Sequence, residues 1–277
     1  MFHQWLGPIF KVLKRPFFGR FMVPWRNPLS SEERLFWKPF LVRSESGAQI
    51  HALFRHADEN MPIHGTLILG HPMGKEAKAA FLKDGYTDFL IELGFNVVVF
   101  DYNGFGESSF GSFSYDKDLA AVIRYVKTTF SPSIPLGYHG ISFGGQWAVV
   151  ALAEQSLPLD FLIIESSPTT LAEFWVHYPI AYRFLIFLNK LLPRFEKRIR
   201  MIDRAGEIQD LKGVLLVYSA ADHYTPVSMG ERYRDAFSVP TELFVLREAE
   251  HAKALRSSDR ESYLSTIKEF LLRVVAI

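Results

Sequence analysis

Cysteine is absent from this 277-residue chain, so disulfides, thiolate catalysis and cysteine-ligated metal sites are excluded. A long apolar run is also missing, because no stretch approaches the roughly 18 uninterrupted apolar residues of a membrane-spanning helix. Charge is balanced, with 31 basic and 30 acidic residues, which gives no reason to expect nucleic acid as a partner. No H-E-x-x-H or comparable ligand spacing occurs, so we expect neither a metal nor a cofactor.

From about residue 36 the chain alternates between two kinds of segment. Short apolar runs predict strands, and longer runs with apolar residues three or four positions apart predict helices. Strands are predicted at 36–42, 48–56, 66–69, 96–100, 136–139, 159–164, 213–218 and 241–246, and helices at 77–93, 116–129, 146–154, 228–237 and 262–275. This alternation predicts an α/β fold with a mostly parallel sheet covered on both faces.

Residues 1–35 precede this pattern and form a basic, aromatic N-terminal arm. Its positive charges, such as Lys11 and Arg20, recur among the apolar residues instead of preceding them, which is not typical of a signal peptide. Two interpretations stand side by side. The arm could make peripheral contact with an anionic membrane surface, or it could pack over the domain as a segment interrupted by Pro8, Pro16 and Pro24. We therefore expect a cytoplasmic protein with or without membrane association.

Within the main domain, residues 36–277, one region breaks the alternation. Residues 168–206 contain no strand signal and are helical and rich in aromatic side chains. The region directly follows a predicted strand, so it should lie at the edge of the sheet where ligands bind. We predict a helical lid over residues 168–206, with Trp175 and Tyr178 available to contact the ligand.

The strongest local signal is the sequence Gly140-Ile-Ser142-Phe-Gly144-Gly145. It fits G-x-S-x-G between a predicted strand and a predicted helix, where the serine occupies a sharp turn and the glycines let strand and helix approach closely. The serine oxygen then projects from the edge of the sheet. This pattern predicts that Ser142 is a nucleophile.

A serine hydroxyl needs a base to remove its proton. Asp222 and His251 each follow a predicted strand. The chain order Ser, Asp, His is the one expected when a G-x-S-x-G serine lies between a strand and a helix of a mostly parallel sheet. We therefore predict that His251 takes the proton of Ser142 and returns it to the leaving group. Ionised Asp222 would fix the tautomer of His251 and stabilise its charged form.

Other interpretations of the same residue types remain open. Asp222 could merely cap the helix that follows it, and His251 could be an ordinary loop histidine. Glu165, at the end of the strand before the lid, is the best rival for the acid. His139 lies within a predicted core strand and is expected to be structural, and His223 is expected to be a bystander.

An oxyanion on the substrate carbonyl needs two preorganised N–H donors. The backbone of Phe143, directly after the nucleophile, is one candidate. The other should come from the loop of residues 70–74, where Pro72 has no N–H and Met73 is the expected donor.

These blocks together resemble the α/β-hydrolase superfamily. The resemblance covers residues 40–277 and rests on the sequences at 71–74, 101–108 and 140–145 together with Asp222 and His251. It implies an eight-stranded, mostly parallel sheet, a serine triad, and a lid inserted after the sixth strand. The chain has His71-Pro72 where the commonest family loop has His-Gly, and its N-terminal arm has no counterpart in the minimal fold.

The implied chemistry is acyl transfer through an acyl-serine that water then hydrolyses. The aromatic lid favours a small, lipophilic carboxylic ester with an apolar acyl or alcohol group, and we expect His71, Trp175 and Tyr178 to contact it. Three alternatives use the same fold: an acyltransferase, a thioesterase, and a non-catalytic interaction protein. A peptidase would need a site for a free amino terminus, and no residues in the sequence suggest one.

Overall fold

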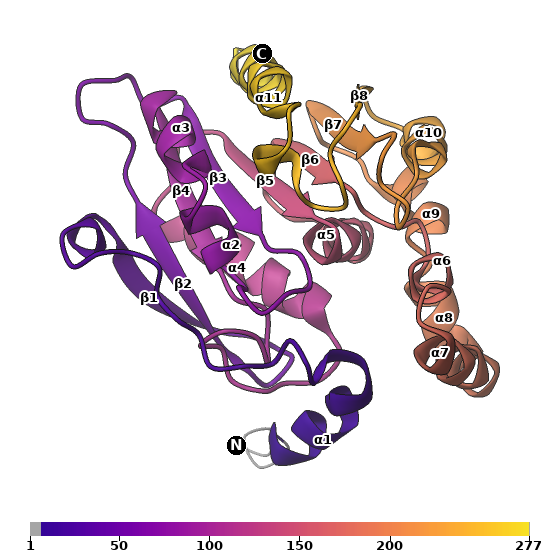
Figure 1. Cartoon of the computed structure of the whole chain (residues 1–277). Coiled ribbons are helices and arrows are strands. Elements are labelled where there is room, and N and C mark those ends of the chain that lie inside the picture. The colour runs from indigo at the N-terminus through magenta and orange to yellow at the C-terminus, as the bar shows by residue number, and fades with distance from the viewer. Residues whose placement is uncertain (1–6, 277) are drawn as a thin grey trace.

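A single eight-stranded sheet forms the centre of the computed structural model, which describes residues 7–276 (Figure 1). The strands lie in the order β1-β2-β4-β3-β5-β6-β7-β8. Their bounds are β1 Lys38–Arg43, β2 Gln49–Arg55, β3 Gly65–Gly70, β4 Phe95–Phe100, β5 Leu136–Ile141, β6 Phe161–Glu165, β7 Gly213–Ser219 and β8 Thr241–Leu246. Strand β2 pairs antiparallel with β1 and β4, and every other neighbouring pair is parallel. The predicted fold class is confirmed.

Helices cover both faces of the sheet. The α-helices are α1 Gly7–Phe18, α2 Ala79–Leu82, α3 Tyr86–Glu92, α4 Tyr115–Thr129, α5 Phe143–Glu154, α6 Leu171–Trp175, α7 Pro179–Leu191, α8 Pro193–Arg198, α9 Met201–Arg204, α10 Val227–Ala236 and α11 Arg260–Val275. Short 3-10 helices lie at η2 Glu33–Phe36, η3 Ala205–Glu207 and η4 Ala254–Arg256. None of the helices within residues 7–276 combines the length and apolar character needed to cross a bilayer.

The alternation of side chains along each strand divides the core in two. In β4, Val98 and Phe100 belong to the core that also contains residues of α4, α5 and α10, whereas Val97 and Val99 belong to the core that contains residues of α3 and α11. Both sets are fully buried, which explains why residues 97–100 are all apolar rather than apolar at alternate positions.

The prediction of one continuous helix over residues 77–93 is wrong. The segment forms two short helices, α2 and α3, with a break at Gly85. Gly85 has φ +72°, a left-handed conformation that interrupts an α-helix and that glycine adopts at little steric cost.

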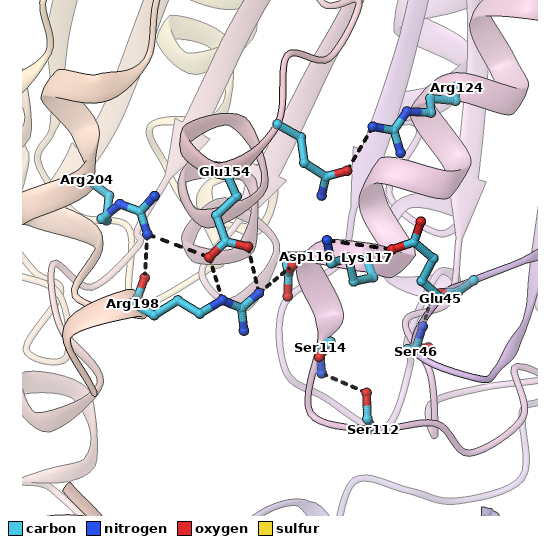
Figure 2. A network of polar contacts seen from close by, with 12 residues as sticks. Glu45, Ser46, Ser112, Ser114, Asp116, Lys117, Arg124, Glu154, Arg198 and Arg204 are labelled. Atoms are coloured by element: carbon cyan, nitrogen blue, oxygen red, sulfur yellow. Dashed lines mark hydrogen bonds and ion pairs between the residues drawn. The ribbon is translucent and has the colours of Figure 1, made fainter. Parts of the chain in front are cut away.

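Helices α6 to α9 fill the connection between β6 and β7 and are called the insert below. Arg198 of α8 holds the insert against the domain (Figure 2). Its guanidinium donates to both carboxylate oxygens of Glu154 in α5 and, over 2.7 Å, to Asp116 in α4. The strand-free region predicted at residues 168–206 is therefore a set of helices tied to the domain by an ionic cluster.

The described part of the N-terminal arm packs on the domain through α1. Lys14 and Phe18 of this helix are buried, and the Lys14 ammonium donates to the side chain of Asn103. Residues 1–6 of the predicted arm lie outside the described residues. The structure therefore bears on the arm from residue 7 onward.

Candidate active site

Ser142 occupies a strained turn between β5 and α5. Its backbone has φ 50° and ψ −107°, and a positive φ is uncommon for a residue with a Cβ. A Cβ at Gly144 would lie only 2.1 Å from the carbonyl oxygen of Gly70, so glycine is required where α5 approaches β3. The glycine spacing thus serves the tight turn that was predicted from the sequence.

Three side chains meet at this edge of the sheet. The Ser142 Oγ lies 3.0 Å from His251 Nε2, and His251 Nδ1 lies 2.8 Å from Asp222 Oδ2. Asp222 follows β7 and His251 follows β8, so the strand order of a parallel sheet brings distant residues together. With Nδ1 donating to the carboxylate, Nε2 is left as an acceptor facing the serine hydroxyl.

Asp222 accepts hydrogen bonds from other groups besides His251. Its Oδ1 accepts from the backbone N–H groups of Tyr224 and Thr225 at 2.8 and 3.0 Å, and its Oδ2 accepts from the Thr225 hydroxyl at 2.5 Å. Burial alone would raise the pKa of Asp222, but the hydrogen bonds and the charge of His251, together with Thr225, outweigh it and lower the pKa. Asp222 is therefore an ionised acceptor.

Sequence reasoning missed Thr225. Its hydroxyl lies within 3.3 Å of His251 Nδ1 as well as against Asp222, so it contacts both members of the pair. The spacing Asp222-x-x-Thr225 before Pro226 is a local turn pattern in which an aspartate side chain accepts from following N–H groups. This turn pattern is the sequence feature that could have identified Thr225 as a partner of Asp222.

An apolar cavity of about 420 Å³ opens at Ser142. The domain contributes Met73, Phe113, Tyr115, Phe143, Gln146 and Trp147, the insert contributes Leu171, Phe174, Trp175, Phe184, Leu185, Leu188, Asn189, Leu192 and Phe195, and α1 contributes Leu13, Phe17 and Phe18. No charged side chain belongs to this lining within residues 7–276. The contribution of α1 was not foreseen from the sequence.

Both predicted oxyanion donors belong to residues that line the cavity beside Ser142. Phe143 is the first residue of α5, and the N–H groups in the first turn of a helix have no intrahelical acceptor. Met73 lies in the loop after β3, next to the same cavity. Their roles as oxyanion donors stay predictions.

Of the three predicted substrate contacts, Trp175 lines the cavity, whereas His71 and Tyr178 do not. His71 is fully buried; its Nε2 accepts from Tyr102 N–H at 3.1 Å, and its Nδ1 lies 2.8 Å from Pro72 O. Burial lowers the pKa of His71, and the two contacts of the neutral ring hold the loop that carries Met73. Tyr178 packs behind the wall, 5.5 Å from the Trp175 ring.

The rival acid and the other histidines lie elsewhere. Glu165 is buried and accepts a hydrogen bond from Tyr263 at 2.7 Å, and its carboxylate lies 3.4 Å from His139. His139 is fully buried, as expected for a structural residue, and His223 is exposed. Within residues 7–276 no three His, Asp or Glu side chains converge as a metal site would require.

The chain is similar in sequence to known proteins. Residues 62–214 match the family model described as "Serine aminopeptidase, S33". The uncharacterized protein YqkD of Bacillus subtilis is 30% identical over 201 residues, which span 67% of this chain and 65% of that protein.

Solved structures share the fold at low sequence identity. The esterase Pf2001 of Pyrococcus furiosus superposes with a TM-score of 0.69 at 20% identity, over 89% of this chain and 94% of that one. XC6422 of Xanthomonas campestris, described as an α/β serine hydrolase without a lid, gives a TM-score of 0.59 at 18% identity, over 90% of this chain and 97% of that one.

Proposed function

Because the chain belongs to the serine aminopeptidase S33 family of the α/β-hydrolase superfamily, we propose that it is a serine hydrolase that cleaves carboxylic esters with an apolar acyl group. The observation that carries the proposal is the apolar cavity of about 420 Å³ that opens at Ser142. Burial of apolar surface there would favour acyl chains that a small acetyl group cannot match.

The proposed reaction begins with attack of Ser142 Oγ on the ester carbonyl. His251 Nε2, 3.0 Å away, accepts the hydroxyl proton as the new C–O bond forms. The N–H groups of Phe143 and Met73 would hold the oxyanion. His251 then gives its proton to the departing alcohol, which leaves an acyl-serine.

Water completes the cycle by the same route. It loses a proton to His251 Nε2 as its oxygen attacks the acyl carbonyl, and the proton returns to Ser142 Oγ when the acid is released. Ionised Asp222 stabilises the charged imidazole in both halves through its 2.8 Å contact with Nδ1.

The family description also raises aminopeptidase activity. An aminopeptidase has to neutralise a free amino terminus, and a carboxylate is the usual partner for an ammonium group. The cavity lining contains no Asp or Glu within residues 7–276, which favours the ester over the peptide. A thioesterase or an acyltransferase would share the acyl-serine and differ only in leaving group or acceptor.

A fluorophosphonate probe and a substrate panel test the proposal together. We expect the probe to label the wild-type protein and not the Ser142→Ala variant. Esters of increasing acyl length should be hydrolysed faster up to medium chains, and an aminoacyl anilide should remain intact. Absence of labelling would contradict the serine mechanism. A steady decline from acetyl upwards, or faster cleavage of the anilide or a matched thioester, would contradict the proposed substrate.

A further inference from the structure

The mouth of the apolar cavity is itself apolar. Leu13 of α1 and Phe184, Leu192 and Phe195 of the insert all line the cavity and are also exposed to solvent. Exposed residues that also line a pocket form its rim. An apolar substrate would therefore meet apolar side chains before it enters.

The apolar surface continues outward from this rim along two helices. Val12 of α1 is 70% exposed and Ile180 of α7 is 88% exposed. Ile180, Phe187 and Leu191 follow helical spacing on the outer side of α7, whereas Leu185 and Leu188 line the cavity on its inner side. A helix that is apolar on both sides usually has both sides covered.

The two helices contact each other beside the cavity. The ring of Phe17 in α1 lies 5.5 Å from the ring of Phe184 in α7; in Figure 1, α1 is at the bottom of the view and α7 at the lower right. We call the exposed apolar residues Ile9, Val12, Leu13, Ile180, Phe184, Phe187, Leu191, Leu192 and Phe195 the apolar face. An exposed apolar patch that surrounds a binding pocket marks an interaction surface.

Basic residues predominate in the two segments that carry the apolar face, and Glu173 and Glu196 flank the second segment. Residues 7–31 contain no Asp or Glu, and neither do residues 174–195. The same segments place exposed basic side chains at Lys11 and Arg15 of α1, at Arg183 and Lys190 of α7, and at Arg194. A surface of apolar residues flanked by Lys and Arg has the composition that is typical of binding to an anionic bilayer.

We propose that α1 and α7 dock the protein on an anionic lipid bilayer, with the mouth of the Ser142 cavity facing the acyl chains. The apolar face would enter the boundary between headgroups and acyl chains, and the basic side chains would contact anionic headgroups. A lipid ester could then pass from the bilayer into the cavity without crossing water. This last step rests on the proposed function, whereas docking itself does not.

Sedimentation with vesicles tests docking without catalysis. The full chain carrying Ser142→Ala is mixed with vesicles of pure phosphatidylcholine or with vesicles containing about one third phosphatidylserine. We expect binding to the anionic vesicles that weakens as salt is raised, because exposed charges are screened. Equal binding to both kinds of vesicle, or no binding to either, would overturn the proposal.

Substitutions outside the cavity lining locate the surface. Ile180→Glu and Val12→Glu should each reduce vesicle binding by about tenfold or more, because a charge would have to enter the boundary region. Replacing Arg183 or Lys190 by Gln should weaken binding about fivefold, from the attraction of one basic side chain to an anionic surface. Leu35→Glu is the matched control, since Leu35 is 85% exposed and lies outside the apolar face.

The controls separate the possible outcomes. All variants should cleave a short, soluble ester at the wild-type rate in the active Ser142 background, which shows that they fold. Equal losses in Ile180→Glu and Leu35→Glu would refute the assignment of the face. A dimer that Ile180→Glu dissociates, without any vesicle binding, would show that a second copy covers the face. A protein that binds vesicles and cleaves no ester would contradict only the proposed function.

Discussion

Phe17 of the N-terminal helix lies edge-on against Trp175 of the insert, with ring centroids 5.7 Å apart and an angle of 69° between the planes. Both rings line the cavity at Ser142, so two segments separated by more than half the chain form one wall. Aromatic pairs in this arrangement attract each other beyond the burial of their surfaces. The N-terminal arm is thus part of the cavity wall at Ser142.

Replacement of Phe17 by Ala removes most of one side of this wall. We expect kcat/KM for an octanoyl ester to fall about tenfold, because one aromatic contact with an acyl chain is worth roughly 1–2 kcal/mol. The value for an acetyl ester should change by less than about twofold, since a short acyl group does not extend far along the cavity. Steady-state rates on the two esters measure the difference.

Phe36→Ala provides the comparison, because Phe36 is also a phenylalanine but is exposed and outside the cavity lining. It should leave both rates unchanged. A parallel loss on acetyl and octanoyl esters in the Phe17 variant would mean that the arm supports the catalytic residues and does not bind the acyl chain.

Thr225 positions the acid and the base of the triad. Thr225→Val removes the hydroxyl that donates to Asp222 Oδ2 over 2.5 Å, and we expect kcat to fall about tenfold, as for a hydrogen bond to a charged group. Loss of that donor raises the pKa of Asp222, since the hydrogen bond is one of the interactions that lower it. The acid limb of the pH–rate profile should therefore move to higher pH.

Thr225→Ser restores a hydroxyl at the same position and should recover most of the rate and the original acid limb. If the serine variant is as slow as the valine variant and neither moves the profile, Thr225 only fills space in the core. Single-turnover rates as a function of pH separate these cases.

Local patterns were sufficient to predict the sheet and the three side chains that meet at its edge. Apolar runs marked the central strands because strands buried on both faces, such as β4, carry few polar side chains. The G-x-S-x-G turn and the strand ends before Asp222 and His251 are short-range features, and parallel topology alone brings them together.

What the sequence could not show depends on contacts between distant segments. Nothing local to residues 7–18 indicates that Phe17 lies against Trp175. His71 was predicted to contact substrate, yet its buried ring accepts from Tyr102 N–H and does not line the cavity. Side-chain direction in a loop is set by its tertiary neighbours, and periodicity carries no information about it.

Lys14 makes the stability of the α1 contact dependent on pH. Burial lowers the pKa of Lys14 to about 7, although the charge of Asp118 opposes the shift. Below about pH 7 the amine is protonated in the folded and unfolded states alike, and the full penalty of burying the charge is present. Between about pH 7 and 10.5 only the unfolded chain binds this proton, so folding stability rises with pH in that window.

Lys14→Met keeps an unbranched side chain of similar length and removes the titration. We expect the free energy of unfolding of the wild type, relative to the variant, to increase by about 1–2 kcal/mol from about pH 6.5 to about pH 8.5. Urea unfolding of both proteins at the two pH values measures it. A difference that stays constant or decreases with pH would show that Lys14 is charged throughout and stabilised by its neighbours.

Arg198 stabilises the insert by neutralising a buried carboxylate. Asp116 has no exposed surface, and burial raises its pKa despite the lowering effect of Arg198, whose Nη2 lies 2.7 Å away. Arg198→Met leaves Asp116 buried without its partner, and we expect the free energy of unfolding to fall by about 2–3 kcal/mol. This loss is smaller than for a fully buried pair because Arg198 is partly exposed. Urea denaturation measures this loss.

A double-mutant cycle with Asp116→Asn shows whether that loss comes from the unpaired carboxylate. Combining Asp116→Asn with Arg198→Met should recover part of the stability, since the asparagine does not bury a charge. Arg200→Met is the matched control, because Arg200 lies two residues away and its ion pairs with Glu196 and Asp203 are more exposed. This substitution should lower the free energy of unfolding by at most about 0.5 kcal/mol. Equal effects of the two arginine variants would show that the insert is held by its apolar contacts alone.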